Sequence, residues 1–402
     1  MVVTIVVLLI LAGISISLVV GDNGLVSRAE RAKELHEEGE RNEQVAMNVY
    51  EDYIAKINSL DPNTLPKGPN GKPLVTEVTT TEHETIIGED AKGNQVVIPG
   101  GFQIAEDSGS TVQEGIVVED SEGNQFVWIP VSNINHDGSN KIKLDDNSEV
   151  EITLGRYTFD ATTGEETIQQ LAIDYTEIVI VEDYYQELSS FREGIDGTNA
   201  TAKNLKGFVE SVEKNKGYYI ARYEASFGSG TASETITNQK PYSKESIANC
   251  GAYGHEMKYM PGTLWGCISQ PEASKVSRNM YEGNYYVESD LLNSYSWDTA
   301  IVYIQKMGNS NYANANCNTT GNKSLLNTGT TGDVKCNIYD MSANLFEWTT
   351  EYSTFASESY GVCSGVERGS NCLNAYSTSR RIHSMPLTYG GDTGFRPIIY
   401  CI

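Results

Sequence analysis

The chain has 402 residues and a mass of 44.1 kDa, enough for one large domain or two moderate ones, each with an ample core. Its formal charge of -25 and pI near 4.6 would repel phosphate backbones and anionic lipid surfaces, which argues against nucleic acid as a partner. The 24 tyrosines and 37 glycines suit surface loops that bind by aromatic contact, although Tyr-rich extracellular domains are also common.

The N-terminal segment predicts a membrane anchor. Residues 1–20 carry no charge and have the length of a membrane-spanning helix, whereas a secretory signal has a basic start and a shorter apolar centre. Residues 22–60 are rich in Ala, Glu, Lys and Arg and allow a long helix that continues out of the bilayer. Together they resemble the stalk of type IV pilin-like proteins, but no basic leader or cleavage glycine precedes the apolar run. We expect residues 1–60 to form an anchor and stalk that could self-assemble through this helix.

A linker and a short internal repeat come next. Residues 61–82 contain Pro, Gly, Asn and Thr in a composition typical of an extended linker. The segment Glu89 to Gln95 is echoed at Glu119 to Gln125, with Gly-Asn in the same place and β-branched residues on both sides. Each copy predicts a hairpin whose turn uses Gly and Asn to reach positive φ.

Residues 83–216 read as a β-rich N-terminal part of the domain. Residues 126–131 are an apolar run that suits a buried strand, and residues 132–190 alternate short strands with polar turns, as an insertion would. Residues 199–216 then have apolar residues at helical spacing before Gly217, which predicts an amphipathic helix. A second helix is predicted from Ser296, as its cap, to Gly308.

All seven cysteines fall at or after Cys250, so any oxidation belongs to the C-terminal region. Closeness in sequence suggests the pairs Cys250 with Cys267, Cys317 with Cys336 and Cys363 with Cys372, which leaves Cys401 over. No Cys-x-x-Cys occurs and the five histidines are scattered, so neither a zinc site nor a thioredoxin-type motif is supported. Disulfides are the preferred interpretation because the N-terminus indicates export.

The segment from Ile338 to Trp348 is the candidate metal site. Asp340 and Glu347 flank a short polar turn, and bulky apolar residues follow that would hold the loop on a core. Two carboxylates together with main-chain carbonyls can bind a hard cation such as Ca²⁺. The alternative is an ordinary turn between strands whose acids are merely solvated.

Four motifs in order resemble the formylglycine-generating enzyme (sulfatase-modifying factor) family. Asp340 to Thr349 is similar to the family signature Asp-Met-Ser-Gly-Asn-Val-Trp-Glu-Trp-Thr, and the other marks are residues 217–224, 368–370 and 394–397. The resemblance covers about residues 84–402, with its core at 217–402. It implies an α+β, C-type-lectin-like fold with an irregular antiparallel sheet and two helices, a fold that diversity-generating retroelements also use for variable binding proteins.

The resemblance also bears on catalysis. Formylglycine-generating enzymes bind copper(I) through a pair of cysteine thiolates shortly after the arginine-glycine motif. Here Cys372 is the single candidate, because Tyr376 and Ser377 stand where the second thiol is expected. Copper is therefore not expected. A related nonheme-iron sulfoxide synthase needs a histidine-rich site, which this sequence does not offer.

By correspondence with the second calcium site of the family, Asp340 and Glu347 would supply side-chain oxygens, and Ala343 and Leu345 would supply carbonyls. Ala343 replaces the usual Gly. The family arginine positions, at Arg368, Arg380 and Arg396, are expected to be buried partners of acids, and Arg222 is expected to pair with Glu224. The candidate ligand face lies in the tail between the last two motifs and comprises Tyr376, Arg381, His383, Tyr389 and Asp392. These five residues could also be ordinary exposed loop residues.

The leading hypothesis is a membrane-anchored, extracytoplasmic lectin-like binding protein that is non-catalytic and recognises an extracellular protein or a glycan. One alternative is an oxidoreductase that modifies sulfatases. Others are a pilin-like filament subunit and a retroelement-diversified binding protein.

Overall fold

The computed structural model describes residues 33, 36, 60–174, 179–186, 205–228, 240–248, 262–316, 325–354, 356–357, 361–362, 365–374, 376–387 and 390–402. Contacts divide the chain after Ser59, and the folded part described below is residues 60–402. Before that point only Lys33 and His36 are described, both helical and exposed. The predicted anchor at residues 1–20 lies outside the described residues. Within the described part of the chain, no helix has the length and apolar character needed to cross a membrane.

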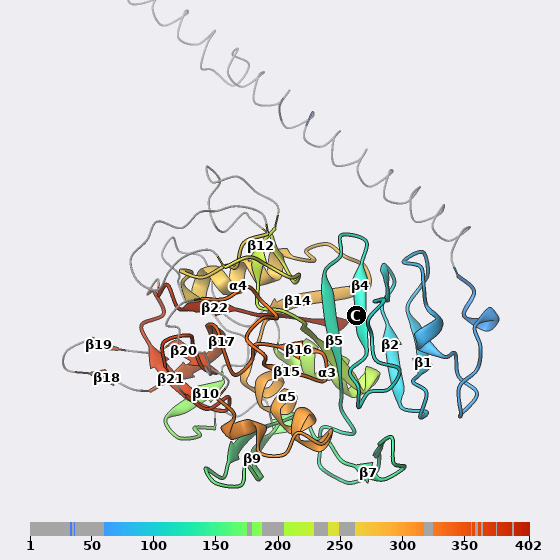
Figure 1. Ribbon diagram of the computed structural model, residues 1–402, viewed down its shortest axis with the longest axis horizontal. Helices are drawn as coiled ribbons and strands as arrows, with labels where there is room; N and C mark the ends of the chain where they lie inside the picture. Colours follow the sequence, from blue (N-terminus) through green and yellow to red (C-terminus); the bar gives the residue numbers. More distant parts are fainter. Residues whose placement is uncertain are drawn as a thin grey trace, which may run out of the picture. The chain divides into compact units, whose positions relative to one another are not determined.

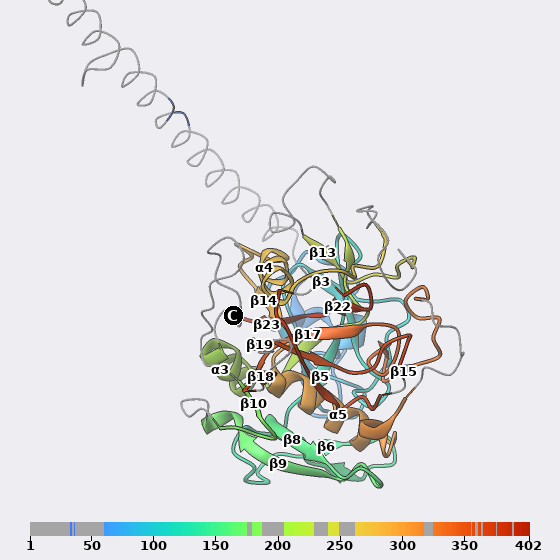
Figure 2. The ribbon, with the colours of Figure 1, turned by 90° about the vertical axis from the view of Figure 1, so that its left-hand side faces the viewer.

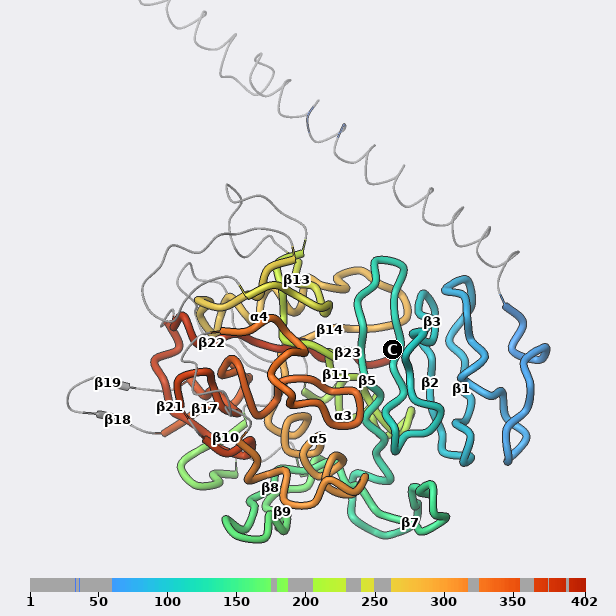
Figure 3. The backbone as a smooth tube through the Cα atoms, viewed as in Figure 1, coloured from blue at the N-terminus to red at the C-terminus, as the bar shows by residue number. Residues whose placement is uncertain are grey.

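A six-stranded antiparallel sheet forms the centre of the fold, with strand order β14-β23-β11-β5-β4-β3. Figure 1 labels β14, β5 and β4 of this sheet, and Figure 3 labels β23, β11 and β3. Its strands are β3 (Phe102–Ile104), β4 (Val117–Asp120), β5 (Gln125–Pro130), β11 (Gly217–Ala221), β14 (Val287–Leu291) and β23 (Pro397–Cys401). The apolar run at 126–131 is a buried strand, as predicted, because β5 lies between β11 and β4. The chain's last strand, β23, lies between β14 and β11 in the interior (Figure 3).

A second sheet is built around the long strand β17 (Phe346–Ser353), whose eight residues are all buried. Its order is β10-β17-β20-β21, and β22 pairs with β17 in parallel. The other bounds are β10 (Tyr184–Gln186), β20 (Gly365–Arg368), β21 (Arg381–Ser384) and β22 (Thr393–Phe395). This sheet brings the three C-terminal motifs into one layer, with Glu347 opposite both Arg368 and Gly394.

The described residues also form six two-stranded ribbons. They are β1 (Ile86–Glu89) with β2 (Gln95–Ile98), β6 (Ile142–Lys143) with β7 (Glu149–Val150), β8 (Gly155–Phe159) with β9 (Glu166–Leu171), β12 (Ser226–Phe227) with β13 (Pro241–Tyr242), β15 (Val334–Lys335) with β16 (Ile338–Tyr339), and β18 (Ala356–Ser357) with β19 (Gly361–Val362). The β8–β9 ribbon lies below helix α5, which spans Ser294–Lys306 (Figure 2).

The described residues of 60–402 form three α-helices, α3 (Leu205–Asn215), α4 (Gln270–Asn279) and α5, so this part of the chain is α+β. Helix α3 buries the predicted apolar face against β11 and β23. Helix α5 is confirmed, but its N-cap is Asn293 rather than Ser296. Ser296 is the third residue of the helix, and its side chain accepts a hydrogen bond from the backbone amide of Asn293, which completes a capping box. Helix α4 was not predicted, although Ser269 and Glu272 form the same motif at its start.

The two repeated segments form hairpins with the same turn. In each, one carboxylate oxygen accepts from two backbone amides of the turn, and the asparagine side chain donates to the other oxygen; the carboxylates are Asp90 and Asp120. Positive φ occurs at Gly93 and Gly123 but not at the asparagines. Instead, Asn94 and Asn124 accept hydrogen bonds from the backbone amides of Lys143 and Ser243, respectively. Each turn therefore holds a segment that is distant in sequence.

Residues 61–82, which we expected to form an extended linker, instead pack on the domain. The side chains of Leu65, Val75 and Val78 are buried in the main hydrophobic core. Glu89 accepts hydrogen bonds from the amides of Asn70 and Lys72. Two short 3-10 turns, at Pro62–Thr64 and Val75–Glu77, give this proline-containing segment its compact course.

Candidate functional site

The predicted metal loop is a buried turn whose polar groups are bonded to the protein. Asp340 and Asn344 both have left-handed backbone, with φ of 66° and 65°, a conformation that Asp and Asn adopt more readily than bulkier residues. The carboxylate of Asp340 accepts from the amide of Gly329 (2.8 Å) and the hydroxyl of Thr331 (2.6 Å). Burial raises the pKa of Asp340 to about 6, and these two bonds only partly offset that effect.

Glu347 is held by Arg396 at the base of this loop. The Arg396 guanidinium contacts Glu347 Oε1 at 2.6 Å, and its Nε lies 3.1 Å from both carboxylate oxygens. Both side chains are buried. The remaining donors of Arg396 reach the carbonyls of Ala221 and Tyr339, so this pair ties β11 and β16 to β17.

Two further buried acids, Asp333 and Glu224, lie around the loop. Asp333 accepts a hydrogen bond from the amide of Ser342 (2.6 Å). Glu224 is the second of these acids. It accepts from the Leu345 amide (2.9 Å) and from the Asn344 side chain (2.7 Å). Burial first, and then the charges of Asp340 and Glu347, raise the pKa of Glu224 well above its usual range. The predicted Arg222–Glu224 pair is wrong, because Arg222 instead donates to Asp107, Gln125 and Asn337.

The carboxylates predicted to bind calcium already form hydrogen bonds or ion pairs with other groups of the protein. The predicted carboxylate ligands, Asp340 and Glu347, face protein donors in this structure, and the amide of Leu345 bonds to Glu224. Within the described residues, no group of three or more His, Cys, Asp and Glu side chains is arranged to hold a metal ion. A Ca²⁺ ion bound by Glu347 would have to displace Arg396 or share its carboxylate with it.

A second buried network joins three arginines to two acids. Glu351 contacts Arg156 (2.6 Å), Arg381 (3.0 Å) and Arg368 (3.1 Å), and Asp298 contacts Arg368 (2.5 Å) and Arg381 (2.6 Å). Burial alone would raise the pKa of Glu351, but the guanidinium groups of Arg381, Arg156 and Arg368 lower it to about 2. The network joins α5 to strands β8, β17, β20 and β21.

The predicted arginine roles are therefore confirmed at two of three positions. Arg368 and Arg396 are fully buried partners of acids. Arg380 is exposed, and its guanidinium lies 3.7 Å from the centre of the Tyr376 ring, so the prediction of a buried pair is wrong there.

The predicted ligand face is divided between interior and surface. The side chain of Arg381 is committed to Asp298 and Glu351, so it stabilises the core. Tyr376 is half-buried and stacks on Phe346 with 5.8 Å between ring centres, while His383 lies half-buried in β21 opposite Val366. Tyr389 lies outside the described residues.

The remaining member of that face, Asp392, lies beside an acid that the sequence did not single out. Asp392 accepts from the Asn371 side chain at 2.5 Å. Burial and the neighbouring charge of Asp392 raise the pKa of Glu367, in β20, to about 7. Glu367 directly precedes the arginine-glycine motif, but all four residues of β20 are buried, so alternation along the strand does not single it out.

Cys372, the single catalytic candidate, packs in a small apolar cluster with Leu264, Leu325 and Leu345 and is 5% exposed. Its backbone amide donates to the carbonyl of Asn344. Each predicted disulfide has one cysteine outside the described residues, so these pairings stay predictions. Cys401, predicted to be left over, is buried in the main core as a free thiol.

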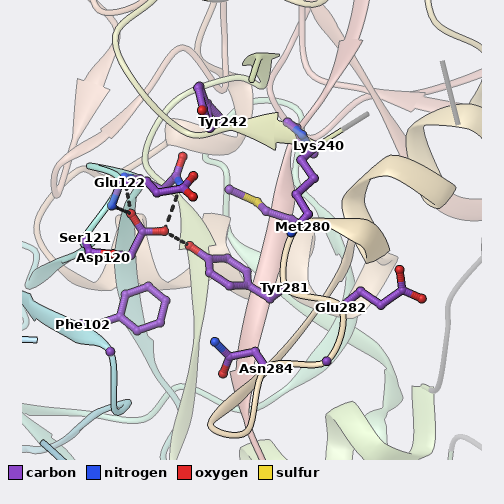
Figure 4. A pocket seen from close by; sticks show the side chains of 14 residues that line it. Phe102, Asp120, Ser121, Glu122, Lys240, Tyr242, Met280, Tyr281, Glu282 and Asn284 are labelled. Atoms are coloured by element: carbon purple, nitrogen blue, oxygen red, sulfur yellow. Dashed lines mark hydrogen bonds between the residues drawn. The ribbon is translucent and has the colours of Figure 1, made fainter. Parts of the chain in front are cut away.

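A pocket of about 380 Å³ was not anticipated from the sequence (Figure 4). It lies between the β4–β5 turn, residues 240–242 and residues 280–284, which follow helix α4. The hydroxyl of Tyr281 donates to Asp120 at 2.5 Å, and its ring packs on Phe102 and Phe126 with centres 5.6 and 5.9 Å away. The missed signal was the second copy of the repeated turn, which supplies Asp120.

No protein-family profile matches the chain, and no curated protein matches it. Two similar solved structures are that of PvdO from Pseudomonas aeruginosa (TM-score 0.29, 14% identity, 46% of this chain and 81% of that chain) and that of CarF (TM-score 0.32, 16% identity, 46% of this chain and 87% of that chain).

Proposed function

We propose that this protein is a membrane-anchored, extracytoplasmic binding module whose domain has the C-type-lectin-like fold of the formylglycine-generating enzyme family. The observation that carries the proposal is the burial of the motif residues. Asp340, Glu347, Arg368 and Arg396 are all inside the fold and bonded to one another or to other protein groups. The motifs therefore serve to hold a scaffold, which leaves recognition to surface loops and pockets.

The surroundings of Cys372 support a non-catalytic function. A thiolate that binds copper(I) or attacks a substrate needs a neighbouring cation or metal and access to solvent. Cys372 is 5% exposed and packs in a cluster of leucine side chains, so its thiol has little access to solvent. The sulfatase-modifying activity remains the alternative.

The alternative activity can be tested directly. The full chain would be incubated with copper and a cysteine-containing sulfatase peptide, and the peptide mass followed over time. We expect no formylglycine product. A product that disappears in a Cys372→Ser variant would contradict the proposal, since it would show that this thiol works as a catalyst.

The location can be tested in a bacterial host that produces the full chain. We expect the protein in the membrane fraction and its domain digested when protease is added to intact cells. A variant that lacks residues 1–20 is the matched control and should leave the membrane fraction. Full-length protein that is soluble in the cytosol and protected from protease would contradict the proposal.

A further inference from the structure

We propose that the pocket of Figure 4 binds a carbohydrate ring that is neutral or carries an ammonium group, and that it excludes acidic sugars and sugar phosphates. This inference rests on the proposed function as a binding module and assigns a ligand class to one site in it. The pocket lies apart from the motif residues, in a region that the sequence did not mark as functional.

The size of the pocket suits a small polar ligand. Its volume of about 380 Å³ lies at the lower end of the range for small-molecule sites, which is roughly 300–1000 Å³. That space holds a ligand of one or two six-membered rings. It is open on one side, where residues such as Glu122 and Glu282 are exposed, so one unit of a longer chain could also enter.

The wall of the pocket is rigid and aromatic. Phe102 and Tyr281 line the pocket, and Phe126, which does not line it, packs on both rings, with 6.3 Å between the centres of Phe102 and Phe126. Asp120 fixes the Tyr281 hydroxyl while it accepts from the amides of Glu122 and Asn124. A wall that is ordered before binding loses little conformational entropy when a ligand arrives.

Tyr242 supplies a second aromatic surface. It is half-buried at the rim, and the ammonium group of Lys244 lies 3.9 Å from its ring centre. The amide of Ser243 donates to Asn124 Oδ1, so Tyr242 is fixed relative to the β4–β5 turn. Aromatic side chains held in this way offer flat apolar area with few rotatable bonds, which suits the C–H face of a sugar ring.

The rim offers both donors and acceptors that are not committed elsewhere. Among the described residues, the side chains of Glu122, Lys240 and Glu282 have no hydrogen-bond or ion-pair partner. The side-chain oxygen of Asn284 accepts hydrogen bonds from the backbone amides of Tyr286 and Val287. The NH₂ group of Asn284 takes no part in these two bonds and can donate to a ligand. Carboxylates accept from hydroxyl groups, whereas Lys and Asn donate to them, so a ring with several hydroxyls can satisfy all of them.

The charges around the pocket favour some sugars over others. Asp120, Glu122 and Glu282 line the pocket together with one cation, Lys240. A second cation, Lys244, lies beside Tyr242 at the rim, so three acids face two cations and the surroundings remain net negative. The whole chain is also strongly negative, at -25. A carboxylate or phosphate on the ligand would therefore be repelled, while a neutral ring would not, and an ammonium group would be attracted.

The test compares sugars that share one ring and differ in charge. The full chain, in a detergent without a sugar headgroup, would be titrated with glucose, glucosamine and glucuronic acid, and with the three matching galactose compounds, by ligand-observed NMR. We expect Kd on the order of 1–10 mM for the neutral or amino form of at least one series, and binding at least about tenfold weaker for its acid. Absence of binding in both series, or a preference for the acids, would overturn the inference.

Variants place the binding in this pocket. Tyr242→Ala should abolish the signal, and the exposed Glu122→Gln should reduce the discrimination against the acid without affecting folding. Tyr285→Ala is the control, because Tyr285 is 70% exposed and does not line the pocket. If sugars bind but Tyr242→Ala and Glu122→Gln change nothing, the pocket is the wrong site and the proposed function stands. The protease and peptide experiments above test that function independently.

Discussion

At the scale of single residues, the interior of this protein contains more charge than a typical core. Arg156, Arg368 and Arg381 share Glu351 and Asp298 without access to water. Burying such ions is costly unless every one is paired, so the removal of one partner leaves an uncompensated charge. We therefore expect the core to be sensitive to conservative changes at these positions.

The first prediction concerns Glu351. Glu351→Gln keeps the size of the side chain but removes the charge that three guanidinium groups share. We expect a loss of roughly 3–5 kcal/mol of unfolding free energy, measured by urea denaturation. The control is Glu210→Gln, which breaks the exposed Lys206–Glu210 pair and should cost about 0.5 kcal/mol or less. Equal losses for the two variants would contradict the structural importance of the network.

The second prediction concerns Glu367 and pH. Its folded pKa is about 7 and the ordinary value is 4.5, so between these values the folded state binds more protons than the unfolded state. Its contribution to stability is thus fully present below pH 4.5 and is lost as pH rises through 7. Glu367→Gln should remove this loss and stabilise the protein above pH 7 by roughly 3 kcal/mol, with little effect near pH 4.

Thermal melting from pH 4 to pH 8 would measure this difference, with the exposed Glu106→Gln as the control. Parallel pH profiles for the wild type and Glu367→Gln would show that Glu367 does not carry the expected proton. Glu351 acts in the opposite direction: with a pKa of about 2 it contributes stability above pH 4.5 that is lost as pH falls toward 2.

The sequence predicted that Arg368 and Arg396 would be buried, as they are. It was less successful in predicting the ion-pair and hydrogen-bond partners of other charged residues. Arg368 and Arg396 were expected to meet acids and do so. Arg222 was assigned to Glu224 by closeness along the strand, but Glu224 bonds to the loop at Asn344, which is 120 residues away. Such partners depend on how distant segments pack, and a pattern within one strand does not contain that information.

At the scale of elements, the repeated hairpin turn is the clearest link from sequence to structure. Both copies place Gly at positive φ and use the same carboxylate and amide bonds. The role of the asparagines was not predictable, because their second partners, Lys143 and Ser243, belong to segments outside the repeat. Helix α4 was missed although its capping box is present in the sequence, since its apolar face is short and mixed with serines.

The third prediction tests the turn. Gly123 has φ of 83° and an added Cβ would come no closer than 3.8 Å to another residue, so Gly123→Ala isolates the backbone cost. We expect a loss of about 1–2 kcal/mol in urea denaturation. Ser121→Ala, at an exposed position in the same turn, should change stability by less than about 0.5 kcal/mol. A neutral Gly123→Ala variant would show that the turn relaxes to another form.

The fourth prediction concerns the loop 338–348. Because Asp340 and Glu347 already face protein donors, we expect chelation of divalent ions to leave the melting temperature unchanged. Added Ca²⁺ should likewise have no effect, with Mg²⁺ as the comparison. A fall in melting temperature on chelation that is absent in Asp340→Ala would establish the calcium site that the sequence suggested.

At the scale of the whole molecule, the α+β class and the burial of the motif strands were predictable from apolar runs and helical spacing. The compact course of residues 61–82 was not, because prolines and glycines indicate a linker while three buried apolar residues, Leu65, Val75 and Val78, bind that segment to the core. The pocket was also hidden, since its walls come from segments as far apart as residues 102 and 284.

The fifth prediction is a disulfide map of the full chain purified without reductant. We expect the pairs Cys250 with Cys267, Cys317 with Cys336 and Cys363 with Cys372, because export exposes the domain to an oxidising compartment. Cys401 should remain a thiol, since it is 3% exposed in the main core. Alkylation of all seven cysteines under denaturing conditions without reduction would contradict both the pairing and the export.

The position of β23 has a consequence for biosynthesis. Residues 397–401 fill the gap between β14 and β11, so the central sheet cannot close until β23 has left the ribosome. Until then the nascent chain carries two open strand edges, which other chains can join. A cell that makes this protein has to shield those edges during translation, and a message truncated shortly before codon 397 would yield a product that aggregates.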